Sequence, residues 1–462
     1  MPDLQAGAAR VGITPPVGVP LSGYFAAEGR TETAREIHDE LYARALVLND
    51  GRTSVAVVTL DLIALGDVEL QIVREAVQRI AGIAPEHLIV ACTHTHSGPI
   101  VEPFPPSDLI PGQADEDYYR LLPRLIASAV ASAARRLRPA RVGAGTGSCA
   151  ININRREFLP DGTLRGLPFL GRNPAGPVDR EVGVVRVDSR ENGQPIAVLM
   201  SYACHPVVLG PNLEISADYV GYALSFVEQA LGTGSVALFA NGAQGDMNAI
   251  IHPGSHADAE HLGHILGATA AKVALDIPTQ PQAQITAATR STKLPLNPAS
   301  APEEQRKYIR FLEAEHERFS REQDRARAWD IEMRLAVANY RLYKREHMEL
   351  PYLPAEITAF GLRGEGVNIG LVSEPAELFC EYGIKARKKS PFETTLVLGL
   401  ANGFVGYVPT PNVYSEGGYE CEATNVAPDA GEQLCQTMIK ALRAAYEGTA
   451  SSPERRKKNV TA

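Results

Sequence analysis

The sequence predicts an α/β fold of multi-layer mixed sheets flanked by helices, with an inserted helical hairpin. Short apolar runs bounded by turn residues alternate with longer segments whose apolar residues recur at helical spacing. Tight-turn sequences such as Asn49-Asp50-Gly51 join some of these runs, so antiparallel pairs are expected beside parallel ones. The stretch 302–349 is instead rich in Glu, Arg and Ala and poor in glycine, which indicates one or two long helices with a charged face.

The apolar runs predict strands, and the helical stripes predict helices. A short first strand ends at Gly12-Ile13-Thr14-Pro15-Pro16, because two prolines cannot continue a ladder. The other predicted strands are 41–48, 53–61, 88–92, 141–145, 182–187, 196–202, 235–240, 367–373 and 395–400. The predicted helices are 68–80, 118–137, 219–231, 257–275, 376–388 and 431–446. No internal repeat is visible in the sequence.

The order of these elements predicts how the chain is divided. We expect residues 1–295 to form the first part of an α/β core and residues 353–450 to form its second part. The helical insertion then covers 296–352. The polar, basic residues 451–462 are expected to form a flexible tail.

Bulk composition excludes several classes of protein. A chain of 462 residues with 45% apolar and 21% charged residues is typical of a folded soluble protein. The net charge of −9 argues against a nucleic-acid partner. No run of residues is long and apolar enough to insert into a membrane. The N-terminus lacks a basic start followed by an apolar segment, and the six cysteines are scattered, so a cytoplasmic location with reduced thiols is expected.

Two histidines follow the buried strand 88–92 in the segment Thr93-His94-Thr95-His96-Ser97-Gly98-Pro99. If the extended geometry continues, His94 and His96 point to the same side. Two such imidazoles suit a divalent metal ion, or one binds it while the other moves a proton. The alternative is a pair of core or loop histidines bonded to nearby carbonyl groups.

Polar residues also follow four other predicted strands. They are His205, Asn241 with Asp246, Glu377, and Asn402 with Tyr407. In open α/β sheets, ligands bind beyond the carboxyl ends of strands, so this distribution predicts one site built from the whole chain. Two histidines, a carboxylate and a further oxygen suit Zn²⁺, with His94 and His205 as nitrogen ligands and Glu377 from the first turn of a helix. Each residue also has an ordinary interpretation, because Glu377 would favour a helix dipole, His205 would pack before Pro206, and Tyr407 would be a strand tyrosine.

Motifs along residues 7–445 resemble the neutral/alkaline (non-lysosomal) ceramidase family. The matching segments are 7–15, 94–99, 152–155, 205–206, 216–222, 241–246, 375–377 and 402–420. The resemblance implies a zinc-dependent, amidase-like core. It implies His94, His205, Glu377 and Tyr407 as the metal ligands. It places His96 and Arg155 beside them, facing the substrate.

The chain also departs from that family. Ceramidases carry a serine just after the Gly-Asp pair of the fifth motif, whereas Gly245-Asp246 is followed here by Met247 and Asn248. A C-terminal β-sandwich is also missing, so we expect a short bacterial-type relative. We therefore predict that a metal-activated water, not a side-chain nucleophile, attacks the substrate.

The predicted function is that of a zinc-dependent hydrolase that cleaves an amide bond of a small polar or acylated substrate. The predicted catalytic residues are His96, Arg155 and Asp246, where Asp246 either holds a ligand histidine or accepts a substrate hydroxyl. Arg155, with Tyr407 as a second candidate, would stabilise the oxyanion. The predicted substrate-binding residues are Asn241, Asp218 and Asn402. Two alternatives stay open, an ester or glycoside hydrolase on the same core and a non-catalytic metal- or sugar-binding relative, and so does homo-oligomerisation.

Overall fold

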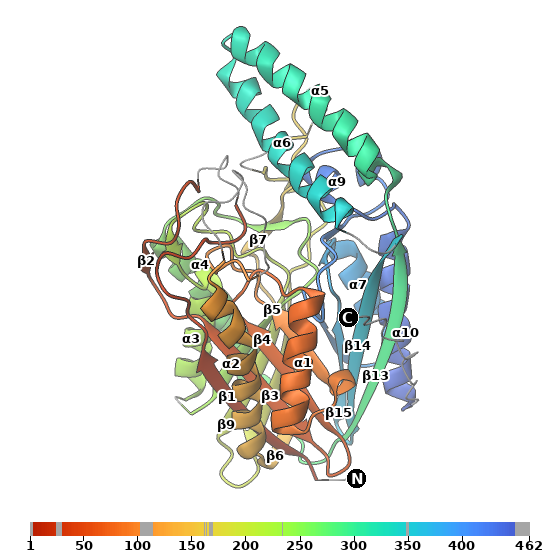
Figure 1. The fold of residues 1–462 in the computed structure, drawn as a ribbon. Helices are drawn as coiled ribbons and strands as arrows, with labels where there is room; N and C mark the ends of the chain where they lie inside the picture. The colour runs from red at the N-terminus through yellow and green to blue at the C-terminus, as the bar shows by residue number, and fades with distance from the viewer. Residues whose placement is uncertain are drawn as a thin grey trace, which may run out of the picture.

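A computed structural model (Figure 1) describes residues 3–24, 30–101, 114–160, 162, 164–165, 170–232, 234–347 and 351–448. The tail predicted for 451–462 lies outside the described residues. Among those residues, no helix combines the length and the apolar character that crossing a membrane requires. The mixed α/β class with several sheets flanked by helices is confirmed.

The largest sheet has eight strands in the order β11-β9-β8-β6-β1-β3-β4-β5. The strands are β1 (Gln5–Gly12), β3 (Tyr42–Asn49), β4 (Ser54–Leu60), β5 (Leu88–Cys92), β6 (Arg138–Ser148), β8 (Glu181–Ser189), β9 (Pro195–Tyr202) and β11 (Val236–Asn241). β4 pairs with β5, and β9 with β11, in parallel, whereas the other pairs are antiparallel. β1 and β6 are paired only through their first residues, so this sheet consists of two halves joined at one corner.

A second sheet has the order β13-β14-β15-β17. Its strands are β13 (Gln284–Pro295), β14 (Tyr352–Gly364), β15 (Val367–Ser373) and β17 (Thr394–Leu398). Three two-stranded ladders complete the strands: β2 (Glu36–Ile37) with β10 (Glu214–Ile215), β7 (Asn152–Asn154) with β12 (Met247–Ala249), and β16 (Glu377–Leu378) with β18 (Tyr407–Val408).

The same order of elements occurs three times along the chain. Three antiparallel strands are followed by a helix, by a fourth strand parallel to the third, and by a second helix. The helix pairs are α1 (Asp67–Ala81) with α2 (Glu116–Arg135), α3 (Asp218–Leu231) with α4 (His256–Asp276), and α7 (Cys380–Lys389) with α10 (Ala430–Glu447). The fourth strands of the three units are β5, β11 and β17, and they pair in parallel with β4, β9 and β15.

The three units share one apolar core. Inner strand residues of all three units, among them Ile89, Leu238 and Leu396, belong to one buried cluster. The other face of the strands of each unit packs against the helix pair of that unit, as the arrangement of α1 and α2 in Figure 1 shows for the first unit. Neighbouring residues alternate between the two sides as strand geometry requires: Val185 lies in the common core, whereas Val184 packs with the α3–α4 cluster.

Local signals define several helix ends. The Asp115 carboxylate accepts a hydrogen bond from the Tyr118 N–H at the start of α2, and Ser255 with Asp258 forms a capping box at the start of α4. Gly82 ends α1 in the left-handed conformation with φ of 70°. These caps satisfy backbone groups that a helix leaves without partners.

The predicted helical hairpin consists of α5 (Pro302–Arg321) and α6 (Arg325–Glu346), and it projects beyond the sheets in Figure 1. Pro295 and Tyr352, which flank it, are directly paired in the β13–β14 ladder. The hairpin is therefore an insertion into a β-hairpin of the third unit. Two short helices, α8 (Val413–Glu416) and α9 (Tyr419–Ala423), lie between β18 and α10.

Some elements were missed from the sequence, and one residue was misplaced. The strands β13 and β14 were not predicted, and β13 has polar and half-buried residues without an apolar run. Glu377 does not lie in the first turn of a helix: it belongs to β16, and α7 begins only at Cys380. The pairing of Glu377 with Tyr407 keeps the chain extended there, and this contact between distant segments outweighs the local helical pattern.

Candidate functional site

His94 follows the buried strand β5 and lies at the end of the common core. The chain does not stay extended, because His94 has a φ of 72°, so the argument that alternation places His94 and His96 on one side was wrong. Backbone hydrogen bonds from Thr93 N–H to Leu60 and from His94 N–H to Leu62 hold this turn. The turn still brings the two rings together, with centroids 5.0 Å apart.

The ring of His94 has a defined tautomer. Its Nδ1 lies 2.7 Å from the carbonyl oxygen of Ile63, and a carbonyl group only accepts hydrogen bonds. Nδ1 therefore carries the proton, and Nε2 presents a lone pair. That Nε2 lies 3.4 Å from the Glu377 carboxylate and has no hydrogen-bond partner among the described residues.

His205 has the same arrangement. It follows β9 and is buried, with Nδ1 at 2.9 Å from the Met247 carbonyl oxygen and 3.0 Å from that of Gln244. Its Nε2 lies 3.0 Å from the Glu377 carboxylate. Burial and the neighbouring Arg155 cation lower the pKa of His205 to about 4, so its imidazole is neutral near pH 7.

His96 completes the group of histidines. Its ring centroid lies 5.0 Å from that of His94 and 5.8 Å from that of His205, and both its nitrogens are buried without a hydrogen-bond partner among the described residues. Burial lowers the pKa of His96 well below its usual value, and the two nearby imidazoles act in the same direction. Gly23 packs against this ring with a φ of 97°, and a Cβ atom there would lie 2.4 Å from the imidazole.

Glu377 and Tyr407 meet because they are paired residues in the β16–β18 ladder. Burial raises the pKa of Glu377, but His94 and His205 outweigh it, and the pKa lies well below its usual value. The carboxylate is therefore ionised. Burial raises the pKa of Tyr407, so its phenol is protonated near neutral pH.

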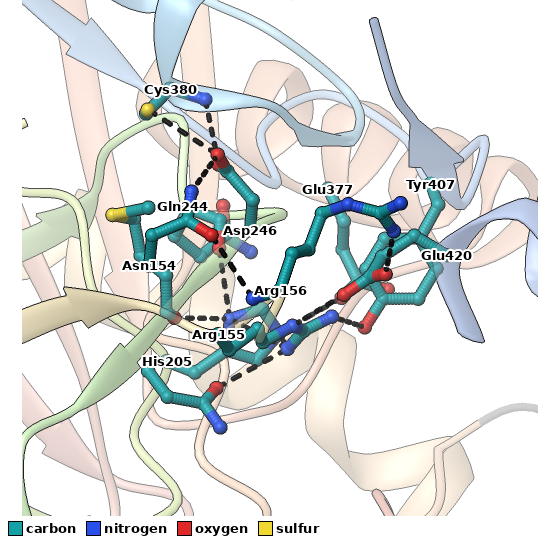
Figure 2. Close-up of polar contacts among 12 residues, drawn as sticks. Asn154, Arg155, Arg156, His205, Gln244, Asp246, Glu377, Cys380, Tyr407 and Glu420 are labelled. Atoms are coloured by element: carbon teal, nitrogen blue, oxygen red, sulfur yellow. Dashed lines mark hydrogen bonds and ion pairs between the residues drawn. The ribbon is translucent and has the colours of Figure 1, made fainter. Parts of the chain in front are cut away.

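Arg155 lies next to these residues and is buried (Figure 2). Its guanidinium donates to Glu420 at 2.8 Å and to the Tyr407 hydroxyl at 2.9 Å, and Nη1 lies 3.2 Å from His205 Nε2. Glu420 also accepts from Arg156 at 2.6 Å. The two arginines outweigh burial and lower the pKa of Glu420, so it balances their charge as a carboxylate.

Asp246 is bonded to the segment that carries Arg155 and forms no hydrogen bond with His94, His96 or His205. It accepts from the Asn154 amide at 2.9 Å and from the Cys380 N–H at 2.9 Å, and its carbonyl oxygen accepts from the Arg155 N–H (Figure 2). Burial raises the pKa of Asp246 to about 7. Its contacts fix the segment that carries Arg155, and a direct catalytic role stays a prediction.

The three predicted substrate-binding residues are buried and bonded mainly to backbone. Asn241 donates to the carbonyls of Thr93 and Cys204 and accepts from the Cys204 N–H. Asp218 accepts from the N–H groups of Leu209 and Tyr219. Asn402 lies between β17 and β18 and is bonded to the backbone of Leu88 and Val90 in β5. These contacts position strands and turns. They give no support to substrate binding by the three residues, which stays a prediction.

Sequence reasoning did not single out Glu420, Arg156 or Asn248. Glu420 lies within a matched motif, Gly417-Gly418-Tyr419-Glu420, but nothing in the spacing links it to Arg155. Asn248 was considered only as a replacement for serine, whereas its side-chain oxygen lies 3.3 Å from Arg155 Nη1. A buried arginine needs a buried carboxylate, and that requirement is the signal that would have directed attention to Glu420.

The donor atoms fit a divalent metal ion. One nitrogen from each of His94, His96 and His205 can be chosen so that all lie within 4.8 Å of one another. Because Nε2 of His94 and of His205 carries a lone pair, both nitrogens face the ionised Glu377 carboxylate acceptor to acceptor. Such a contact needs a proton or a cation between the groups. Arg155 Nη1 lies 3.2 Å from His205 Nε2, whereas His94 Nε2 has no hydrogen-bond partner among the described residues, so the uncompensated contact is the one at His94. Metal ligands need these same states, neutral imidazole and ionised carboxylate.

Comparisons with known proteins identify the family and the fold of the chain. The family model of the neutral/alkaline non-lysosomal ceramidase N-terminal region matches residues 4–265. The solved neutral ceramidase from Pseudomonas aeruginosa is similar with a TM-score of 0.72 and 19% identity, over 98% of this chain and 76% of that one. A structure described as a ceramidase complexed with C2 is similar with a TM-score of 0.71 and 18% identity, over 98% and 77% of the two chains. The chain belongs to the neutral/alkaline non-lysosomal ceramidase family.

Proposed function

We propose that this member of a hydrolase family is a zinc-dependent amidase that cleaves a C–N bond of a small polar or acylated substrate. The main support is the meeting of two Nε2 lone pairs with the ionised Glu377 carboxylate. With His94, His205 and Glu377 as ligands and Tyr407 as a fourth, the set matches the nitrogen and oxygen donors that Zn²⁺ prefers. His96 is then left beside the metal.

A bound zinc ion would polarise the substrate carbonyl and lower the pKa of a water molecule. His96 is a neutral imidazole, so it accepts the proton of the attacking water and returns it to the leaving amine. The buried Arg155 cation stabilises the negative charge that develops on the carbonyl oxygen. Glu420 holds that cation in place.

The described thiols do not suit nucleophilic attack. Cys204 adjoins His205 and Cys380 contacts Asp246, but burial raises the pKa of both thiols far above neutrality. A protonated thiol is a poor nucleophile. With Met247 and Asn248 after Gly245-Asp246, attack by water is the mechanism that these residues support.

A chromogenic panel tests the proposal. The zinc-loaded protein is offered p-nitroanilides, p-nitrophenyl esters and p-nitrophenyl glycosides of matched small acids and sugars, together with a short-chain ceramide. We expect turnover of the anilides or of the ceramide, and loss of turnover in His96→Ala. Turnover of esters or glycosides alone would contradict the amidase proposal and identify the protein as an esterase or a glycosidase. Binding without turnover across the panel would favour a non-catalytic relative.

A further inference from the structure

The helical hairpin is connected to the arginine of the site through one short helix, α9. In Figure 1, α6 of the hairpin lies next to α9. An apolar seam that includes Ile309, Leu312 and Ile331 holds α5 against α6, so the hairpin has a small core of its own. It therefore provides a preformed surface against which α9 can be fixed.

Two arginines of α6 bind α9. Arg334 contacts the Glu422 carboxylate through Nη2 at 2.9 Å and Nε at 3.1 Å, and it also donates to the Tyr308 hydroxyl of α5 at 2.5 Å. Arg341, which is buried, donates to the backbone carbonyl of Glu422 at 3.0 Å. Glu422 thus receives contacts from α6 on both its side chain and its backbone.

The other side of α9 binds the site. Glu420, two residues before Glu422, accepts from Arg155 at 2.8 Å and from Arg156 at 2.6 Å, as the dashed lines in Figure 2 show. Residues two positions apart in a helix point to nearly opposite sides. A helix of five residues is too short to be stable by itself, so contacts on its two sides determine where it lies.

We propose that the α5–α6 hairpin positions the Arg155 guanidinium, with Arg334 acting through Glu422, α9 and Glu420. Arg334 is a positioning residue and touches no reacting group. Its effect on turnover rests on the proposed amidase function, whereas its effect on α9 does not. The hairpin is then part of the catalytic apparatus and not an independent appendage.

The central variant is Arg334→Met, which keeps the aliphatic stem and removes the ion pair. Arg306→Met is the matched control, because Arg306 lies on the same hairpin and pairs with the exposed Glu346. Hydrogen exchange of the peptide that covers 419–423 should be about tenfold faster in Arg334→Met and unchanged in Arg306→Met. Unchanged exchange in Arg334→Met would overturn the proposal, whatever substrate the protein uses.

A kinetic cycle tests the link to Arg155. With the best anilide of the panel, Arg334→Met should lower kcat about five- to twentyfold, with KM changed less than twofold and zinc content unchanged. In an Arg155→Met background the same substitution should lower kcat almost no further, because the guanidinium that the hairpin positions is absent. An undiminished effect in that background would show a general structural role and refute the proposal. Glu422→Gln replaces Arg334→Met in both experiments if the latter does not fold.

Discussion

The side-chain amide of Asn241 donates a hydrogen bond to the Thr93 carbonyl oxygen over 3.1 Å, and this bond joins the first and second units of the fold just before His94. The backbone carbonyl of Asn241 accepts from the Gly399 N–H of the third unit. Asn241 therefore connects all three units at the end of the common core.

We predict that Asn241→Ala destabilises the protein by about 2–5 kcal/mol, because it leaves buried backbone groups of Thr93 and Cys204 without partners. Urea unfolding measures the change, with Asn339→Ala, on the exposed face of α6, as the control. Normal stability with a raised KM would instead support the substrate-binding role predicted from the sequence.

The metal prediction concerns His94 and His205. We expect about one tightly bound Zn²⁺ per chain, and its loss in the His94→Ala/His205→Ala double variant, because two neutral imidazoles disappear from the site. Elemental analysis of purified and of zinc-reconstituted protein measures the content. His264→Ala, on the exposed side of α4, should keep the metal. Absence of any transition metal from the reconstituted wild type would refute the site.

The water mechanism makes a prediction about His96 and about covalent intermediates. His96→Ala should lower kcat about 100-fold or more while zinc affinity changes little, because the proposed role of His96 is proton transfer. Mass spectrometry of protein quenched during turnover should detect no acyl adduct. A stoichiometric adduct on a serine, threonine or cysteine would refute attack by water. Equal loss of metal and activity would make His96 a ligand, as its place in the three-histidine group also allows.

The hairpin is removable by design, because Pro295 and Tyr352 are cross-strand partners. Directly paired residues lie about 5 Å apart, so a short Gly-Ser turn can replace 296–351 and keep both partners. We expect the shortened protein to keep its zinc, because no predicted ligand lies in the insertion. Its kcat should fall as in Arg334→Met. Loss of zinc would mean that the insertion belongs to the core and that the predicted boundary is wrong.

We expect the ionisation of Asp246 to contribute to the pH dependence of the free energy of unfolding. Its pKa is about 7 in the folded protein, against about 3.9 for an aspartate in an unfolded chain. Between about pH 4 and pH 7 the folded state binds more protons, so Asp246 makes stability fall as pH rises, by at most about 1.4 kcal/mol per pH unit. Asp246→Asn, which cannot ionise, should remove this contribution from the free energy of unfolding. An identical pH profile for both proteins would contradict the raised pKa.

The sequence determined the class of the fold and most of its elements. The runs at 88–92 and 196–202 are strands, and the charged stretch at 302–346 is a helical hairpin, because periodicity and composition report local burial directly. The threefold recurrence of the unit was invisible, since the same strand positions accept different apolar residues. The motifs and their order resembled those of the family, and the family model confirms this resemblance.

The tertiary structure alone decided how the site is assembled. His94 turns toward His205 because Leu60, Leu62 and Ile63, far away in the chain, bind its backbone and ring. Glu377 is extended because it pairs with Tyr407, and Asn241 faces Thr93 and Cys204 because three units converge there. Local sequence patterns record which side of an element is buried, whereas the direction of a side chain beyond a strand end depends on partners that only the folded chain brings near.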